Sequence, residues 1–172
     1  GGGAQDGDIV VASSISKTAG DDVTLTLKAA ENITINTSVS IASVNNKLHT
    51  ILWSDSDTSD SGYVYLDTSS SISTNGGDIT MGGGADPETG YAVGDGTLVD
   101  VNYYAGVELV SSTLSSSGGA ITLHGKSFDA AGNTGTRYVP GVRISGPSSI
   151  NSGDGKVSIV GQARGGFEFL KG

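Results

Sequence analysis

The chain has 172 residues, of which 28 are glycine, 35% are hydrophobic and 16% are charged. The length predicts one domain. Glycine and side chains with a β-branch or a β-hydroxyl enter helices less readily than Ala, Leu, Glu or Lys. This composition therefore excludes a mainly helical fold. Eighteen acidic residues against nine basic ones give a formal net charge of −9, which excludes nucleic acid as a partner because its phosphates would be repelled.

The chain contains no cysteine, which excludes disulfides and thiolate metal sites. No stretch approaches the ~20 apolar residues of a membrane-spanning helix. The first residues read GGGAQDGD, with neither a methionine nor a basic and apolar leader. We therefore expect residues 1–172 to form a single segment of a longer or processed polypeptide.

From the N-terminus onward, the sequence repeats a unit of three short apolar segments five times. The first two units read DIVVASSISKTAGDDVTLTL from Asp8 and NITINTSVSIASVNNKLHTIL from Asn32. The other three begin with GYVYLDT at Gly62, GVELVSS at Gly106 and GVRISGP at Gly141. They continue as SISTNGGDITM, TLSSSGGAITL and SINSGDGKVSI, each with an apolar residue in second, ninth and eleventh place.

The length of a unit is nearly constant from its first segment to its third, whereas the distance between units varies. Ile9 precedes Val23 by 14 residues and Tyr63 precedes Ile79 by 16, and the other units fall within this range. The first segments of successive units start 24 to 44 residues apart. All the variation therefore follows the third segment.

A meander of hairpins would not confine long loops to every third connection. A coiled ribbon would, because each strand pairs in parallel with its equivalent one turn later, about 4.8 Å away. We predict an all-β fold, a single-stranded parallel β-helix (β-solenoid) of about five three-sided rungs with loop excursions at one corner. The predicted inward columns are Ile9, Ile33, Tyr63, Val107 and Val142; Ile15, Val39, Ile72, Leu114 and Ile150; and Val23, Leu48, Ile79, Ile121 and Val157.

Glycine pairs stand between the second and third segments of the later units: Gly76 and Gly77, Gly118 and Gly119, Gly153 and Gly155. A sharp bend there requires a positive φ, which glycine adopts without steric cost. We expect these residues to form one corner of the solenoid.

The phrases GVELVSS…GGAITLHG and GVRISGP…GKVSIVGQ resemble the β-solenoid repeats of filamentous-haemagglutinin-like adhesins and related giant bacterial surface proteins. The resemblance covers roughly residues 8–165. It implies a right-handed β-helix, export to the bacterial surface or beyond, and a role in attachment or in an extracellular fibre. It supplies no catalytic residues.

The residue types that carry chemistry are few. His49 and His124 are predicted on the third strands of alternate units, too far apart for one metal ion. Asp55, Asp57 and Asp60 form an acidic loop that makes calcium a candidate ligand, although no glutamate closes an EF-hand pattern. Glu108 and Arg143 are predicted to form a cross-strand ion pair of at most about 1 kcal/mol.

Glycan-active enzymes also use β-helices, and two or three carboxylates that converge in a groove would favour that alternative. The predicted outward positions of the strands place no such pair on one face. We therefore expect a protein that is not an enzyme and that has no cofactor other than the calcium considered above. Outward threonines such as Thr24, Thr80 and Thr122 raise ice binding as a third hypothesis, although His49 and Ser158 interrupt their column.

Aromatic side chains gather in the predicted excursions, so they are expected along one flank of the solenoid. Two interpretations remain open: they pin down long loops, or they form a contact surface for glycans or for a neighbouring fibre. The longest excursion, residues 82–105, is the best candidate. The candidate ligand-binding residues are Trp53, Tyr91, Tyr103, Tyr104, Phe128 and Tyr138.

A solenoid exposes unpaired strand edges at both ends, and such edges pair with other chains unless they are covered. We therefore expect end-to-end stacking, either on further rungs of the same chain or on another copy.

Overall fold

The computed structural model describes residues 7–95, 105–128 and 140–163, which form β-strands and no helix. Among these residues there is consequently no helix that could cross a membrane. The strands are β1 (Ile9–Val11), β2 (Ile15–Lys17), β3 (Val23–Lys28), β4 (Ile33–Ile35), β5 (Ser40–Ser43), β6 (Leu48–Ser54), β7 (Val64–Leu66), β8 (Ser71–Ser73), β9 (Ile79–Gly83), β10 (Ala92–Val93), β11 (Val107–Val110), β12 (Thr113–Ser115), β13 (Ile121–Lys126), β14 (Val142–Ser145), β15 (Ser149–Asn151) and β16 (Val157–Gln162).

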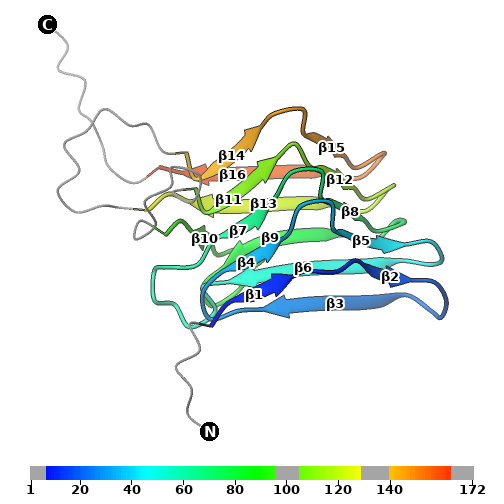
Figure 1. Ribbon diagram of the computed structural model, residues 1–172, viewed down its shortest axis with the longest axis horizontal. Helices are drawn as coiled ribbons and strands as arrows, with labels where there is room; N and C mark the ends of the chain where they lie inside the picture. Colours follow the sequence, from blue (N-terminus) through cyan, green and yellow to red (C-terminus); the bar gives the residue numbers. More distant parts are fainter. Residues whose placement is uncertain (1–6, 96–104, 129–139, 164–172) are drawn as a thin grey trace, which may run out of the picture.

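The strands are distributed over three parallel sheets, as Figure 1 shows. The first sheet has the order β1-β4-β7-β11-β14, the second β2-β5-β8-β12-β15, and the third β3-β6-β9-β13, with β16 and β10 also paired to β13. We use "trio" for three strands that visit the sheets in turn: trio 1 is β1–β3, trio 2 β4–β6, trio 3 β7–β9, trio 4 β11–β13 and trio 5 β14–β16. Each strand pairs in parallel with its equivalent in the next trio, an all-β arrangement that fits the predicted β-solenoid.

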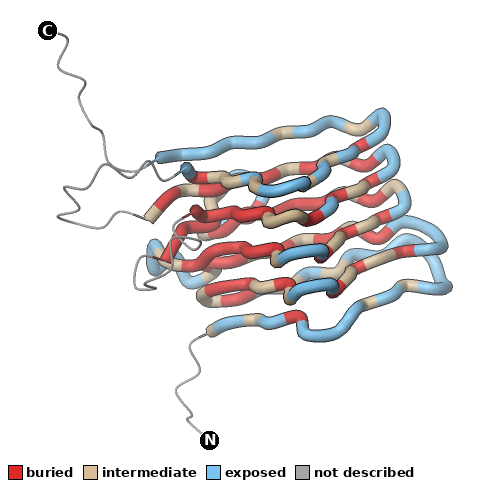
Figure 2. The backbone as a smooth tube through the Cα atoms, turned by 45° about the horizontal axis from the view of Figure 1, so that its top comes forward, coloured by how far each residue is buried: buried red, intermediate tan, exposed pale blue. Residues whose placement is uncertain are grey.

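The core lies between the three sheets, where apolar side chains stack in columns. In the middle trios these side chains are completely buried, and burial decreases toward both ends of the stack, as Figure 2 shows. The columns are Ile9, Ile33, Val64, Val107 and Val142 in the first sheet; Ile15, Ile41, Ile72, Leu114 and Ile150 in the second; and Leu27, Leu52, Met81, Leu123 and Ile159 in the third.

The predicted register was wrong in the first sheet of trio 3. Val64, not Tyr63, pairs with Ile33 and Val107. The stretch YVYL is apolar at every position, so its alternation fits either register. Val64 and Leu66 join the core cluster, whereas the Tyr65 hydroxyl lies 3.4 Å from the Asp67 carboxylate, a polar partner that the apolar interior does not offer.

Trio 2 corrects two other predicted columns. Ile41, not Val39, pairs with Ile15 and Ile72 in the second sheet. In the third sheet Leu48 pairs with Val23, as predicted, but Thr50 pairs with Ile79. Strand β6 is long enough to shift the column by two residues, because Leu48, Thr50 and Leu52 all point inward. The same shift places Ile51, rather than His49, beside Thr80.

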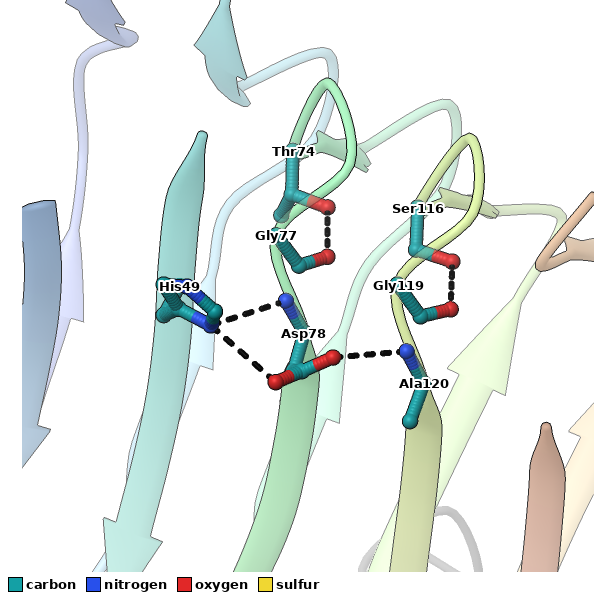
Figure 3. A network of polar contacts seen from close by, with 7 residues as sticks. All are labelled: His49, Thr74, Gly77, Asp78, Ser116, Gly119 and Ala120. Atoms are coloured by element: carbon teal, nitrogen blue, oxygen red, sulfur yellow. Dashed lines mark hydrogen bonds and ion pairs between the residues drawn. The ribbon is translucent and has the colours of Figure 1, made fainter. Parts of the chain in front are cut away.

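A buried hydroxyl closes the corner between the second and third sheets. In four trios a Ser or Thr Oγ donates to the carbonyl oxygen three residues later: Ser43 to Asn46 at 2.8 Å, Thr74 to Gly77 at 2.5 Å, Ser116 to Gly119 at 2.5 Å and Ser152 to Gly155 at 2.7 Å. Figure 3 shows two of these turns. In trio 1 the equivalent residue is Lys17, whose ammonium donates to the carbonyl oxygen of Gly20 at 3.2 Å.

The corner glycines have two different roles. Gly76 and Gly118 adopt positive φ angles of 92° and 114°, as predicted. Gly77 and Gly119 are instead required by close approach between trios, because a Cβ on Gly119 would collide with the backbone of Gly77. The glycine pairs therefore mark a corner, as predicted, but only the first glycine of each of these two pairs is explained by its positive φ. The second is explained by packing between trios.

The corner between the first and second sheets contains a hydrogen-bonded carboxylate. Asp67 accepts hydrogen bonds from the Thr37 hydroxyl and from the Thr68 N–H, both at 2.6 Å. Partial burial by itself raises the pKa of Asp67, but the bonds from Thr37, Thr68 and Tyr65 outweigh burial and hold this pKa below its ordinary value. The charged form of Asp67 therefore stabilises this corner.

Replacement of Ser116 by Ala tests the hydroxyl closure. The variant leaves the buried carbonyl of Gly119 without its donor, so we expect the free energy of unfolding to fall by about 1–2 kcal/mol in urea titrations. Ser115→Ala, which removes a partly exposed hydroxyl from the neighbouring position of β12, is the control and should change stability by less than ~0.5 kcal/mol. Equal effects of the two substitutions would contradict the assigned role.

Thr50 offers the opposite test. Its Oγ1 is buried without a hydrogen-bond partner in the described structure, within a column otherwise made of Leu25, Ile79, Ile121 and Val157. Thr50→Val has nearly the same shape and removes the unsatisfied hydroxyl, so we expect a gain of about 1 kcal/mol in the free energy of unfolding. A loss of stability in this variant would show that the hydroxyl has a partner in solution.

Candidate functional site

One pocket lies where the strands of the third sheet end and the chain leaves for its excursions. Asp55 follows the last residue of β6, Gly84 follows the last residue of β9, and Lys126 is the last residue of β13. Because parallel strands end at a common edge, these residues from trios 2, 3 and 4 come together. The pocket has a volume of about 320 Å³ and is lined by Asp55, Thr58, Asp60, Gly84, Tyr91, Val93 and Lys126; we call it the corner pocket.

The loops that form the corner pocket are attached to the sheets by specific hydrogen bonds. Gly62, in the loop between β6 and β7, and Val93 of β10 exchange two backbone bonds of 2.9 and 2.8 Å. Beneath them, the Ser54 hydroxyl donates to the Gly62 carbonyl at 2.7 Å. The indole N–H of Trp53 donates to the carbonyl of Gly84 at 2.7 Å. Both loops are therefore held before any ligand arrives.

The charged groups of the pocket differ in how far they are buried. The Lys126 ammonium lies 3.1 Å from the Asp60 carboxylate, and Asp60 is the more exposed of the two. Asp55 is buried, and burial raises its pKa above the ordinary value of 3.8. Neighbouring charges on Asp57 and Asp60 raise the pKa further, while hydrogen bonds from Ser59 and Ser61 oppose the shift. The pocket thus combines an ion pair with a buried carboxyl whose pKa is raised.

An aromatic ring closes one side of the pocket. Tyr91 is half-buried, and its ring centroid lies 5.8 Å from that of His124 on β13, with the planes tilted by 36°. The Nδ1 atom of His124 is buried without a hydrogen-bond partner in the described structure. Tyr91 thus lines the pocket, and its ring lies next to that of His124.

The six aromatic residues predicted as ligand contacts are placed differently from one another. Tyr91 lines the corner pocket. Trp53 belongs to β6 rather than to an excursion, and the Lys28 ammonium lies 3.7 Å from the centroid of its ring. Phe128 is half-buried just after β13. Tyr103, Tyr104 and Tyr138 lie outside the described residues.

Both histidines lie on the third sheet with β9 between their strands, as predicted. His49 Nδ1 lies 3.1 Å from Asp78 Oδ2 and 3.2 Å from the Asp78 backbone nitrogen, which donates to it. The other Asp78 oxygen accepts the N–H of Ala120 at 2.7 Å (Figure 3). Asp78 thus ties trios 2, 3 and 4 together, and His49 is part of this structural network.

The acidic loop does not assemble the ligand set of a metal site. In residues 7–95, 105–128 and 140–163, no three His, Asp or Glu side chains are grouped so as to hold a metal ion. Calcium at Asp55, Asp57 and Asp60 therefore stays a prediction.

The predicted ion pair between Glu108 and Arg143 is present at 2.9 Å. Its Glu108 side chain is only 2% exposed, so the small value expected for a surface pair does not apply. Loss of Arg143 would leave a buried carboxylate without its cation. The pair is thus a structural link between trios 4 and 5.

Sequence reasoning missed most of the corner pocket. Asp55, Asp60 and Tyr91 were named from the sequence for other reasons, but Lys126 was not, and it is 66 residues from its partner Asp60. Their positions in the repeat could have indicated that they are close, because Asp60 follows the third segment of one unit and Lys126 ends the third segment of another. Asp55 and Asp60 also bring two carboxylates into one pocket, which the predicted strand faces did not reveal.

Comparison with known proteins assigns no family. No family model matches the sequence, and neither a curated protein nor a solved structure matches the chain.

The raised pKa of Asp55 gives a pH-dependent prediction. The folded protein keeps this proton to a higher pH than the unfolded chain, so the group lowers the free energy of unfolding as the pH rises above 3.8. We expect Asp55→Asn, which retains an oxygen to accept from Ser59, to be more stable than the wild type at pH 7. The difference should close as the pH falls below 3.8, when the carboxyl is protonated in both states.

Thermal unfolding monitored by circular dichroism between pH 3 and pH 7 measures this difference. Asp21→Asn removes an exposed carboxylate from the turn between β2 and β3, away from Asp55, and serves as the control, with little effect at either pH. A variant at Asp55 that is less stable at pH 7 would contradict the electrostatic picture.

Proposed function

We propose that the chain is a non-enzymatic structural and adhesive segment of an exported bacterial surface or extracellular-fibre protein, with its ligand contact at the corner loops. In this proposal each trio is one rung of a right-handed, three-sided β-helix of about five rungs. The resemblance of the repeat phrases to filamentous-haemagglutinin-like adhesins supports export and attachment. End-to-end contact, with further rungs or with another copy, belongs to the same proposal.

The corner pocket is the observation that carries this function. Loops on a rigid scaffold commonly hold binding sites, and this pocket is built by the loops after β6 and β9, by β10 and by the end of β13, on one edge of a sheet. Its lining offers an aromatic ring, carboxylates, a hydroxyl and an ammonium group. Sugars present apolar ring faces and outward hydroxyls. Tyr91 can therefore stack on a sugar ring, while Asp60 accepts hydrogen bonds from the sugar hydroxyls and Lys126 donates to them. Glycans of a host or of a matrix are therefore the proposed ligands.

A β-helix enzyme that acts on polysaccharides is the second candidate, because one specific observation favours it. Asp55 and Asp60 line the same pocket, and burial holds Asp55 toward its protonated form while Asp60 pairs with Lys126. Two carboxyl groups in unequal environments are what acid and base catalysis of glycoside cleavage requires.

Binding to an array of immobilised glycans tests the first candidate. We expect the wild type to bind a subset of glycans and Tyr91→Ala to bind them at least 10-fold more weakly, because the stacking surface is lost. Thr113→Ala, which changes an exposed side chain on the second sheet, is the matched control and should bind normally. Absence of binding by the wild type, or equal binding by all three proteins, would overturn the proposal.

The same glycans separate binding from catalysis. If incubation with the wild type releases new reducing ends and Asp55→Asn does not, the enzyme candidate replaces the adhesive one. Binding without cleavage leaves the adhesive function in place.

A further inference from the structure

Among the described residues, no further strand pairs with the outer edges of trio 1 and trio 5. We call the outer edge of β1, β2 and β3 the trio 1 face and the outer edge of β14, β15 and β16 the trio 5 face. Ile121 and Leu123 of β13 are completely buried, whereas the next members of the same columns, Val157 and Ile159 of β16, are 43% and 44% exposed. Figure 2 shows this change from buried middle trios to exposed outer ones.

Exposed large aliphatic side chains are concentrated on the outer trios. Seven such residues occur among the described residues, and Val44, in the turn between β5 and β6, is the only one outside trios 1 and 5. The others are Val10 and Val23 in trio 1, and Ile144, Val157, Ile159 and Val160 in trio 5. Since these trios also carry the strand edges without a neighbouring trio, their exposure marks surfaces suited to further strands.

The two faces match each other in strand length. Strands β3 and β16 have six residues each, β2 and β15 have three each, and β1 and β14 have three and four. The corners also match what is already packed in the molecule. In trio 5, Ile150 follows Val142 by eight positions and Val157 follows Ile150 by seven. Trio 2 has the same two spacings between its residues Ile33, Ile41 and Leu48. These three residues are paired in register with trio 1, so trio 5 has the spacing of a trio that already packs on trio 1.

The charges of the two faces are opposite in sign. Trio 5 carries Arg143 and Lys156 against Asp154, a net charge of +1 in a chain whose net charge is −9, with Arg143 paired to Glu108 of trio 4. Trio 1 carries Asp21 and Asp22 against Lys17 and Lys28, and with Asp8, which immediately precedes β1, this end has a net charge of −1.

One pairing places two opposite charges side by side. Lys156 immediately precedes β16, and Asp22 immediately precedes β3. Alignment of Val157 with Val23 of another copy would therefore bring Lys156 next to Asp22. On the other side of β3, where Val23 pairs with Leu48 of trio 2, Asp22 accepts the backbone N–H of Lys47 at 2.8 Å, so a lysine and this aspartate already stand at equivalent positions of adjacent trios.

We propose that a second copy of this chain stacks head to tail, its trio 1 face on the trio 5 face of the first. The new pairs are β14 with β1, β15 with β2 and β16 with β3 of the second copy, all parallel, which continues the three sheets. This inference rests on the proposed function, because it requires the stacked rungs. A contact between unlike faces leaves one of each face free, so repetition gives an open filament rather than a closed dimer.

Two surface substitutions block one face each. Val23→Lys places an ammonium on the trio 1 face, and Ile159→Lys places one on the trio 5 face, where a second copy would bury it. Val44→Lys puts the same charge on an exposed site away from both faces and is the matched control. Because all three residues are exposed, circular dichroism and urea unfolding should report the same folded protein in each case.

Sedimentation velocity over a range of concentrations and negative-stain electron microscopy provide the measurement. We expect the wild type and Val44→Lys to form filaments with increasing concentration, and each face variant alone to associate at least 10-fold more weakly. A mixture of Val23→Lys and Ile159→Lys should form a dimer and nothing larger, because the first retains its trio 5 face and the second its trio 1 face.

Each other outcome has a defined meaning. A folded wild type that stays monomeric throughout overturns the second copy as occupant and leaves further rungs of the same polypeptide to cover the faces. Association that both face variants retain on their own indicates a lateral contact and also overturns it. Neither result contradicts the proposed function. That function is contradicted by a different result: the absence of binding on the glycan array, or the absence of β-structure in the chain.

Discussion

The parallel pairing of each strand with its equivalent one trio later is the interaction on which the whole structure depends. It places residues of the same column directly against one another, so an apolar residue in one trio is buried by the corresponding residues of the two adjacent trios. No trio has an interior of its own, and stability is therefore shared between neighbours. The decrease in burial from the middle of the stack to its outer trios is the direct result.

The connections between the three sheets are under different constraints. At the corner between the second and third sheets, a buried hydroxyl and a glycine in contact with the adjacent trio fix the length of the turn. At the corner between the first and second sheets, Ser38, Ser69, Ser111 and Gly146 all adopt positive φ, and Asp67 binds two neighbours. Between the third and first sheets, the connections 29–32 and 55–63 differ in length and sequence, and β9 is followed by the loop 84–91 and the additional strand β10. Insertions accumulate there because no repeated bond is broken, and the corner pocket follows from that freedom.

The repeat could be predicted from sequence because its two constrained corners keep the spacing of the apolar segments constant. The register could not be predicted wherever both alternations were apolar, as in YVYL, or where a strand was long enough to slide by two residues, as in β6. Trp53 was assigned to a loop because β6 was expected to end before it. Aromatic character alone pointed to Tyr91, whereas the pairing of Lys126 with Asp60 depends on the three-dimensional path of two separate loops.

Stacking within the chain and stacking between chains would use the same bonds but differ in entropy. Consecutive trios belong to one covalent chain, so each meets its neighbour at an effective concentration on the order of millimolar. Two separate copies have no such connection and must also overcome the repulsion between chains of net charge −9. The opposite charges of trio 1 and trio 5 act where the copies touch, while the remaining charge acts at longer range and is screened by salt. The fold of a single chain should therefore be independent of concentration, whereas contact between end faces should depend on both concentration and ionic strength.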